Sequence, residues 1–183
     1  MLRLTVPLAV HDTAFFTFSS LRAGLESTMA IVRDSLDQDA SNDTLRFTMI
    51  APLPVGQLVL NELMLDPLIG RPEWVELYNA APVPVSLDSC TLITGTTSLT
   101  HITLQSGYVA PLGYAVIAAN DSLFAEYTDL RPSESIVTAG RSSLGLSNDS
   151  TSIVLRAPQS LGEVTLDSVR YHADWHTTIL PDR

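Results

Sequence analysis

Four carboxylates within residues 58–79 are the first side chains of this chain that could do chemistry: Glu62, Asp66, Glu73 and Glu76. Two carboxyl groups that face each other across a cleft can hydrolyse a glycosidic bond, with one of them acting as general acid. Glu62 and Glu76 would approach each other if they lie in adjacent strands. A structural role competes with catalysis. Glu76 can form a cross-strand pair or accept backbone N–H groups, and Asp66, which precedes a proline, is typical of a turn. We favour the structural role.

A second candidate is the motif His172-x-Asp174-x-His176. On a strand, all three side chains would lie on one face, as the ligands of a transition metal must. No further His or Cys lies near them in the sequence. An exposed polar turn is therefore the favoured interpretation. A hydrolase that uses the His172/His176 pair, or the pair Glu62/Glu76, is kept as the alternative function.

Acidic and hydroxyl residues also recur along one polar segment, at Asp34, Asp37, Asp39, Ser41 and Asp43. The part Asp37-x-Asp39-x-Ser41-x-Asp43 resembles the first half of a calcium loop, in which oxygen ligands alternate along a turn. Asn42 stands where such loops have glycine, and Thr48 stands where they have a bidentate Glu. Asp, Asn and Ser are also the ordinary residues of turns. A solvated hairpin turn is therefore favoured, and calcium is kept as the one candidate cofactor.

Trp74 and Tyr78 are the candidate binding residues. Their segment alternates, with Val75 and Leu77 on one face of a strand and the two aromatic rings on the other. Exposed aromatic rings would offer a patch for a ligand. The core is nevertheless the favoured place for side chains of this size.

The elements that must position these residues read as short strands. Residues 58–65 are rich in branched apolar side chains, two proline-containing breakers follow, and residues 73–79 then alternate. Asn120 can cap one helical turn over residues 121–127. Further strands are expected near residues 83–87, 90–94, 100–104, 114–119, 135–137, 152–156 and 163–171.

Four more strand patterns come earlier in the chain, near residues 4–8, 14–18, 26–33 and 44–50. Because a closed sandwich needs about seven strands, residues 1–51 read as the rear half of one module. Residues 52–56 contain two prolines and make a short, semi-rigid connector. Residues 57–183 then form the second domain. The rival interpretation is that the first strands extend the sheets of that second domain.

Composition excludes some classes of partner. The chain has 183 residues and a formal net charge of −10, and all ten of its basic residues are arginines. An acidic chain repels the phosphate backbones that nucleic-acid binders must neutralise and anionic lipid surfaces. We therefore expect no nucleic-acid partner. No run is apolar and long enough for membrane insertion. Cys90 is the only cysteine, and a buried thiol is its favoured role.

Several segments carry a family resemblance. Asn61-Glu62-Leu63-Met64, Asp66-Pro67 and Glu73-Trp74-Val75-Glu76-Leu77-Tyr78-Asn79 resemble the opening signature of bacterial lamin tail domains. Later segments resemble the following strands of that family in the right order: residues 84–92, 110–118, 146–150, 152–156 and 167–171. Cys90 stands where the family usually has Trp. The resemblance implies an all-β fold, an immunoglobulin-like antiparallel β-sandwich, for residues 57–183. Residues 1–51 resemble the C-terminal half of a bacterial cell-adhesion-related module.

These observations favour a non-catalytic structural or binding module of a larger secreted or cell-surface bacterial protein. It would serve as a spacer, in adhesion or in ligand binding, and both ends of the chain look cut. Its expected partners are other domains of the same polypeptide, and protein or carbohydrate at the cell surface. Nucleophile-elbow, phosphate-loop and dinucleotide motifs are absent from the sequence. A filament role by analogy with nuclear lamins has no support, because the chain has no heptad segment.

Overall fold

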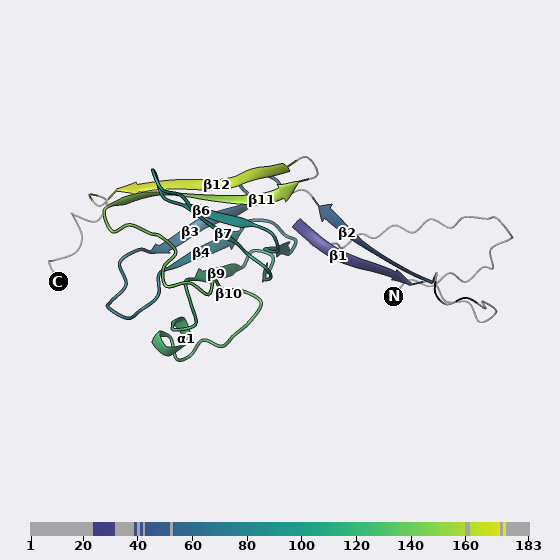
Figure 1. Cartoon of the computed structure of the whole chain (residues 1–183), viewed down its shortest axis with the longest axis horizontal. Coiled ribbons are helices and arrows are strands. Elements are labelled where there is room, and N and C mark those ends of the chain that lie inside the picture. Colours follow the sequence, from purple (N-terminus) through teal and green to yellow (C-terminus); the bar gives the residue numbers. More distant parts are fainter. Residues whose placement is uncertain are drawn as a thin grey trace.

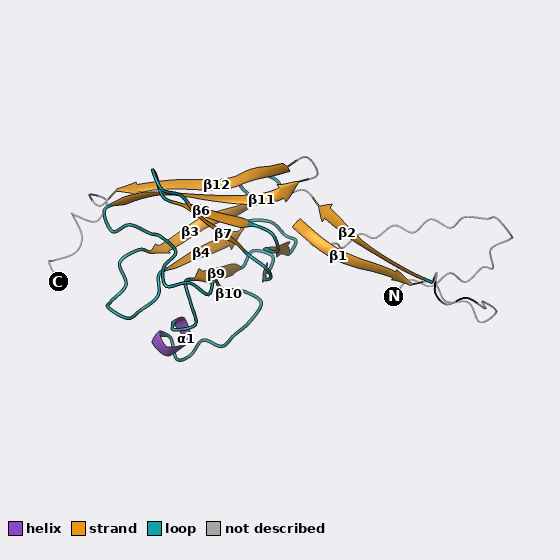
Figure 2. Ribbon diagram, viewed as in Figure 1, coloured by secondary structure: helices purple, strands orange, loops and turns teal. Residues whose placement is uncertain are grey.

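Two four-stranded sheets pack face to face (Figure 1). The computed structural model describes residues 24–31, 39, 41, 43–51, 53–159, 162–172 and 174. The first sheet, which we call the β4 sheet, has the strand order β10-β9-β4-β3. The second, which we call the β11 sheet, has the order β12-β11-β6-β7. Figure 2 shows that strands make up nearly all of the regular structure.

The strands of each sheet come from distant parts of the chain. The β4 sheet contains β3 (Leu58–Met64), β4 (Trp74–Asn79), β9 (Tyr114–Ala118) and β10 (Ile136–Thr138). The β11 sheet contains β6 (Thr91–Thr94), β7 (Thr100–Thr103), β11 (Ser150–Gln159) and β12 (Gly162–His172). The remaining elements are the short pair β5 (Val85–Ser86) and β8 (Tyr108–Val109), the helical turn α1 (Leu123–Glu126), and the hairpin of β1 (Gly24–Ile31) with β2 (Thr44–Ala51).

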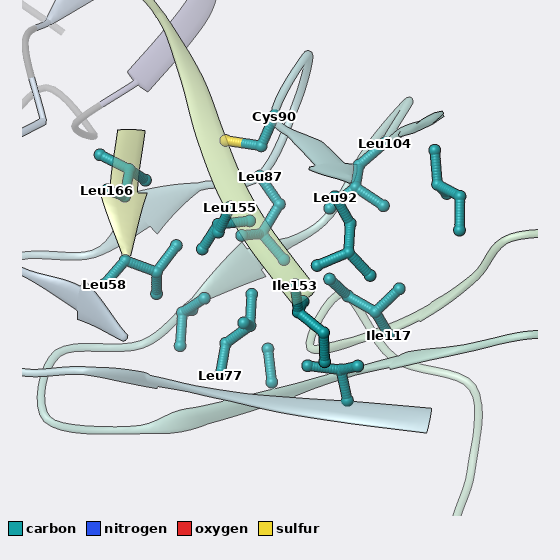
Figure 3. Close-up of a cluster of buried hydrophobic side chains, with 14 of the residues drawn as sticks. Leu58, Leu77, Leu87, Cys90, Leu92, Leu104, Ile117, Ile153, Leu155 and Leu166 are labelled. Carbon is teal, nitrogen blue, oxygen red and sulfur yellow. The ribbon is translucent and has the colours of Figure 1, made fainter. Parts of the chain in front are cut away.

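Alternation along the strands fills the space between the sheets. Val75 and Leu77 of β4 are fully buried, and so are Ile153 and Leu155 of β11. Successive side chains on a strand point to opposite faces, so every second residue reaches the core. Figure 3 shows Leu77 and Ile117 of one sheet in the same cluster as Ile153 and Leu155 of the other. Each such side chain stabilises the fold by about 1.5–3 kcal/mol through burial.

The prediction of an immunoglobulin-like antiparallel sandwich is confirmed, with one local departure. Strand β10 pairs with β9 in parallel, with Ile136 opposite Val116 and Thr138 opposite Ala118. Parallel neighbours need a crossover connection of a dozen or more residues. Residues 119–135, which include α1, supply that length.

Each sheet carries one bulge in an edge strand, β3 in the β4 sheet and β12 in the β11 sheet. In β3, Asn61 is an extra residue between the pairs Leu60–Leu77 and Glu62–Glu76. In β12, Leu166 is an extra residue opposite the Leu155–Arg156 step of β11. Bulges bend a strand and increase its twist, and they are frequent at sheet edges.

Asp167 lies next to the β12 bulge and protects the edge of β3. The Leu60 backbone N–H donates to Asp167 Oδ2 at 2.8 Å, and the Gly56 N–H donates to the Leu166 carbonyl at 3.1 Å. Unpaired N–H groups on an edge strand otherwise invite pairing with another chain. The carboxylate therefore satisfies an edge donor and ties the two layers together.

The helical turn differs from its prediction. It spans only Leu123–Glu126, and its N-cap residue is Ser122, which makes no side-chain capping hydrogen bond. Asn120 Oδ1 instead accepts hydrogen bonds from the Ser122 N–H at 3.0 Å and the Ser122 hydroxyl at 2.6 Å. Asn120 thus shapes the turn before the helix, the ordinary habit of an Asn side chain in a loop.

Strands β1 and β2 form the N-terminal hairpin, a two-stranded sheet. Its strands pair antiparallel over eight residues, from Gly24 opposite Ala51 to Ile31 opposite Thr44. The strands predicted near residues 4–8 and 14–18 lie outside the described residues, so the division at residues 52–56 stays a prediction. Within the described ranges, no helix is long and apolar enough to cross a membrane.

Replacing Asp167 by Ala tests the edge contact. The Leu60 N–H would lose its acceptor, which costs about 1–3 kcal/mol of unfolding free energy when the group is partly buried. Urea denaturation measures that loss, and hydrogen exchange at the Leu60 amide should become faster. Asp129→Ala, at an exposed position, is the matched control. Unchanged exchange at Leu60 in Asp167→Ala would show that the carboxylate does not protect the edge.

Candidate functional site

The four candidate carboxylates do not converge on one cleft. Glu62 and Glu76 are direct cross-strand partners in β3 and β4, and Glu76 Oε1 accepts a hydrogen bond from Asn61 Nδ2 at 2.7 Å. Asp66 Oδ1 accepts from Asn148 Nδ2 at 2.8 Å. The structure therefore brings Glu62 and Glu76 together. Asp66 and Glu76 each accept a hydrogen bond from a different asparagine side chain.

Of the four carboxylates, Glu73 accepts hydrogen bonds from the largest number of groups in the described part of the chain. Its Oε2 accepts the backbone N–H groups of Leu144 at 2.7 Å and Leu146 at 3.2 Å. The Ser143 hydroxyl lies 3.2 and 3.1 Å from its two carboxylate oxygens. Hydrogen bonds to an ionised acceptor are about twice as strong as neutral ones. A carboxylate so fully occupied by the protein's own donors is an anchor for residues 143–147, which we call the anchored loop.

Two further side chains hold the anchored loop against the β11 sheet. Thr94 Oγ1 donates to the Leu144 carbonyl at 2.6 Å, and the Tyr171 hydroxyl donates to the Ser147 carbonyl at 2.5 Å. Gly145 lies between Leu144 and Ser147 in the sequence. Its φ is +79°, and a Cβ there would lie 2.9 Å from Thr94 Oγ1. Only glycine adopts this conformation at low cost. Both the backbone conformation and the lack of space for a side chain therefore favour glycine at this position.

Asn79 is a second anchor that sequence reasoning missed. It is fully buried, and its Nδ2 lies within hydrogen-bond distance of the Val83, Val109 and Ala110 carbonyls, at 2.8, 3.3 and 3.0 Å. Its Oδ1 accepts the Ala81 N–H at 3.0 Å. A buried amide with both ends satisfied fixes the turn after β4. Its only sequence signal is an Asn that ends an alternating strand and points to the apolar side.

Burial keeps two ionisable groups neutral. It raises the pKa of the Cys90 thiol to about 12, with the charge of Asp88 adding to the effect. It also raises the pKa of Tyr171 to about 12, with a smaller contribution from the charge of Glu73. Since a thiolate is the reactive form of cysteine, the buried Cys90 behaves as the predicted apolar core residue.

The aromatic candidates lie on the outside of the sheet. Core positions were favoured for Trp74 and Tyr78, but the structure places them half-buried on the outer face of β4, because Val75, Leu77 and Asn79 take the inner face. Tyr78 lies opposite Tyr114 of β9, with ring centroids 5.0 Å apart and ring planes inclined by 39°. Tyr114 is 54% exposed.

These rings share their face of the sheet with the paired carboxylates. We call this surface the aromatic face and define it by Trp74, Tyr78, Tyr114, Glu62 and Glu76. A tyrosine pair presents an apolar platform with polar hydroxyl tips. Neighbouring carboxylates can accept hydrogen bonds from a ligand that rests on it. The arrangement suits binding of a ring-shaped or polar ligand on an open surface.

The histidine motif is described only in part. His172 ends β12, and its Nδ1 lies 3.7 Å from Asp174 Oδ1, with both side chains exposed. His176 lies outside the described residues.

The acidic turn of the hairpin is likewise described only in part. Asp39 Oδ1 accepts hydrogen bonds from the Ser41 N–H at 3.1 Å and the Ser41 hydroxyl at 2.5 Å, and these bonds lower the pKa of Asp39. Asp34 and Asp37 lie outside the described residues. Among residues that the structure does describe, no three metal-binding side chains come together. The contacts are those of an ordinary turn, and calcium binding stays an untested possibility of the sequence.

The fold defines this molecule as an immunoglobulin-like β-sandwich domain, in which the Glu73 and Asp167 carboxylates accept hydrogen bonds from the protein's own backbone. A model of the lamin tail domain family matches residues 52–173. The chain therefore belongs to the lamin tail domain family, as the segments around Glu62 and Trp74 indicated. No curated protein matches the chain.

Glu73→Gln tests the anchor. The amide loses the negative charge and half of the acceptor capacity, so the variant should lose about 1.5–3 kcal/mol of unfolding free energy. Chemical denaturation gives the value. Glu76→Gln is the control, because its single recorded hydrogen bond, from Asn61, is exposed. An equal effect of the two substitutions contradicts the special role of Glu73.

Alkaline titration tests the two buried acids. The folded pKa values of Cys90 and Tyr171, about 12, lie above ordinary values of 9.0 and 10.0. The unfolded chain therefore loses these protons first, and stability falls as pH rises from about 9 toward 12. Thermal melting across this range should show the decline. In the double variant Cys90→Ala/Tyr171→Phe, the melting temperature should fall less with pH, measured from that variant's own value at neutral pH. A decline of the same slope in the double variant would assign it to other groups.

Proposed function

We propose that this chain is a non-catalytic, ligand-binding module of a larger secreted or cell-surface protein, and that its aromatic face binds carbohydrate. The observation that carries the proposal is the ring pair of the half-buried Tyr78 and the exposed Tyr114, beside Glu62 and Glu76. Sugar rings have apolar faces that rest on aromatic rings, and hydroxyl groups that donate to carboxylates. An open sheet surface admits an internal stretch of a polymer as readily as its end.

Several contacts support a binding role in preference to hydrolysis. Glu73, Glu76 and Asp66 each accept hydrogen bonds from the protein itself. Glu62 and Glu76 lie side by side on one face of a sheet, as cross-strand partners do. A glycoside hydrolase holds its two carboxylates on opposite sides of the scissile bond. The paired carboxylates of this face therefore suit recognition of hydroxyl groups.

The same arrangement supports the proposal that its partners include other domains of the same polypeptide. The family match begins at residue 52, next to the predicted proline connector, and a β-hairpin precedes it. A module linked in series to other domains of one polypeptide is the ordinary setting for a compact sandwich. The charge of −10 favours a neutral glycan over nucleic acid as the ligand of the aromatic face.

Binding of neutral oligosaccharides to the full chain tests this function. Calorimetry with gluco- and chito-oligosaccharides, with the fluorescence of Trp74 as a second signal, should detect binding to the wild-type chain. Tyr114→Ala should weaken it about threefold to tenfold, since aromatic contacts contribute about 0.5–1.5 kcal/mol. Tyr127→Ala removes a tyrosine that is 38% exposed outside this face and should bind as the wild type does.

Two results would contradict the proposal. One is binding that Tyr114→Ala leaves unchanged. The other is glycoside turnover that Glu62→Gln or Glu76→Gln abolishes, which would establish the hydrolase alternative instead.

A further inference from the structure

The outer face of the β11 sheet holds a groove lined by residues of β6, β7, β11 and β12. Its volume is about 500 Å³. Its floor is formed by Ile93 of β6 and Val154 of β11, which are direct neighbours across the strands. Ile93 points away from the core and is nevertheless only 6% exposed, so the surrounding side chains rise around it. The strands that carry the groove are labelled in Figure 1.

Two arginines flank this apolar floor. Arg156 lies two residues after Val154 on β11, and Arg170 of β12 lies directly opposite Ser152. The side chain of Arg156 is 43% exposed, and within the described part of the chain it forms an ion pair with Glu163, whose Oε2 lies 3.6 Å from Arg156 Nη1. No ion pair of Arg170 is recorded among the residues the structure describes. An exposed pair such as Arg156–Glu163 contributes little, so a ligand can replace it.

The lining of the groove contrasts with the rest of the chain. The protein carries 20 acidic and ten basic residues, yet the groove residues include two arginines and His101 but no carboxylate. A local cluster of one charge sign raises the concentration of oppositely charged ligands beside it. The charge of this surface is therefore complementary to an anionic ligand.

The floor selects among anionic ligands. It is built from aliphatic side chains, Ile93, Val154 and Leu99, and contains no aromatic ring on which a sugar or a base could stack. An extended peptide that carries both carboxylates and an aliphatic side chain matches this floor and its flanks.

The strand register also sets the spacing of such a peptide. Arg170 lies at the level of Ser152, four residues before Arg156. This offset corresponds to about 14 Å along the strands at about 3.4 Å per residue. In an extended peptide, residues i, i+2 and i+4 lie on one face and span the same length. The two arginines and the apolar floor between them therefore match the pattern acidic-x-aliphatic-x-acidic.

We propose that this groove is a docking site for an extended acidic peptide segment of a partner protein, with carboxylates at i and i+4 on Arg156 and Arg170 and an aliphatic side chain at i+2 on Ile93 and Val154. Arginine forms two parallel hydrogen bonds with a carboxylate, which favours this ligand over a single point charge. The site lies on the sheet opposite to the aromatic face, so the two surfaces can be occupied together.

Calorimetry with the full chain and the peptide acetyl-Ser-Asp-Thr-Leu-Thr-Asp-Ser-amide tests the site. We expect binding that weakens as ionic strength rises, because salt screens exposed charges. The peptide with Asn in place of both Asp should bind at least tenfold more weakly. Equal binding of the two peptides, or no binding of the acidic one, overturns the proposal.

Variants of the chain locate the contact. Arg156→Gln and Arg170→Gln should each weaken the acidic peptide about threefold to tenfold, and the double variant should bind it no better than the Asn peptide. Arg141→Gln, at an exposed arginine outside the groove, is the matched control. Melting temperatures within a degree or two of the wild type confirm that the variants fold.

Two other ligands complete the test. An oligogalacturonate or a single-stranded DNA that binds this groove more tightly than the peptide, with the same arginine dependence, assigns the site to another polymer and overturns the proposal. Tyr114→Ala should bind the acidic peptide as the wild type does. A wild-type chain that binds the acidic peptide but no neutral oligosaccharide therefore contradicts the aromatic face and leaves the groove standing.

Discussion

The Glu73 carboxylate is the polar contact that ties the anchored loop, and through it the β11 sheet, to the β4 sheet. It lies immediately before β4 and accepts the Leu144 and Leu146 N–H groups, which belong to the segment that leads into β11. The opposite side of that segment is held from the β11 sheet by Thr94 and Tyr171. One loop thus binds both layers. Because its polar groups are satisfied while partly buried, breaking any one contact leaves unpaired groups and costs more than the bond itself contributes.

This constraint explains how the domain uses its carboxylates. Asp167 also satisfies a backbone donor, because it accepts a hydrogen bond from the Leu60 N–H at one edge of the sandwich. An antiparallel sandwich leaves edge strands and long loops with unpaired backbone donors, and acidic side chains are strong acceptors for them. Glu73, one of the four carboxylates that suggested hydrolysis, therefore has the same structural role as Asp167. The outer faces remain available for ligands, one aromatic with Tyr78 and Tyr114, the other basic with Arg156 and Arg170.

The sequence predicted the elements that are encoded by a pattern of neighbouring residues. The alternation around Val75 and Leu77 predicted β4, and its motif residues predicted the family and the fold. Contacts between residues far apart could not be predicted. Two of the donors to Glu73 are backbone groups about 70 positions away, which no pattern of side chains marks. The groove likewise requires the register of four strands, since Arg156 and Arg170 acquire a common face only after β11 and β12 pair. Tyr78 was expected in the core because residue type, without topology, does not distinguish the two faces of a strand.

Native-state hydrogen exchange at the Leu144 and Leu146 amides tests the central claim most directly. If Glu73 anchors this loop, both amides exchange only through large unfolding events, at rates close to those of Ile153 and Leu155 in the middle of β11. Exchange as fast as that of the exposed Ser133 and Glu134 would show that the loop opens independently of the sheets, and would contradict the account.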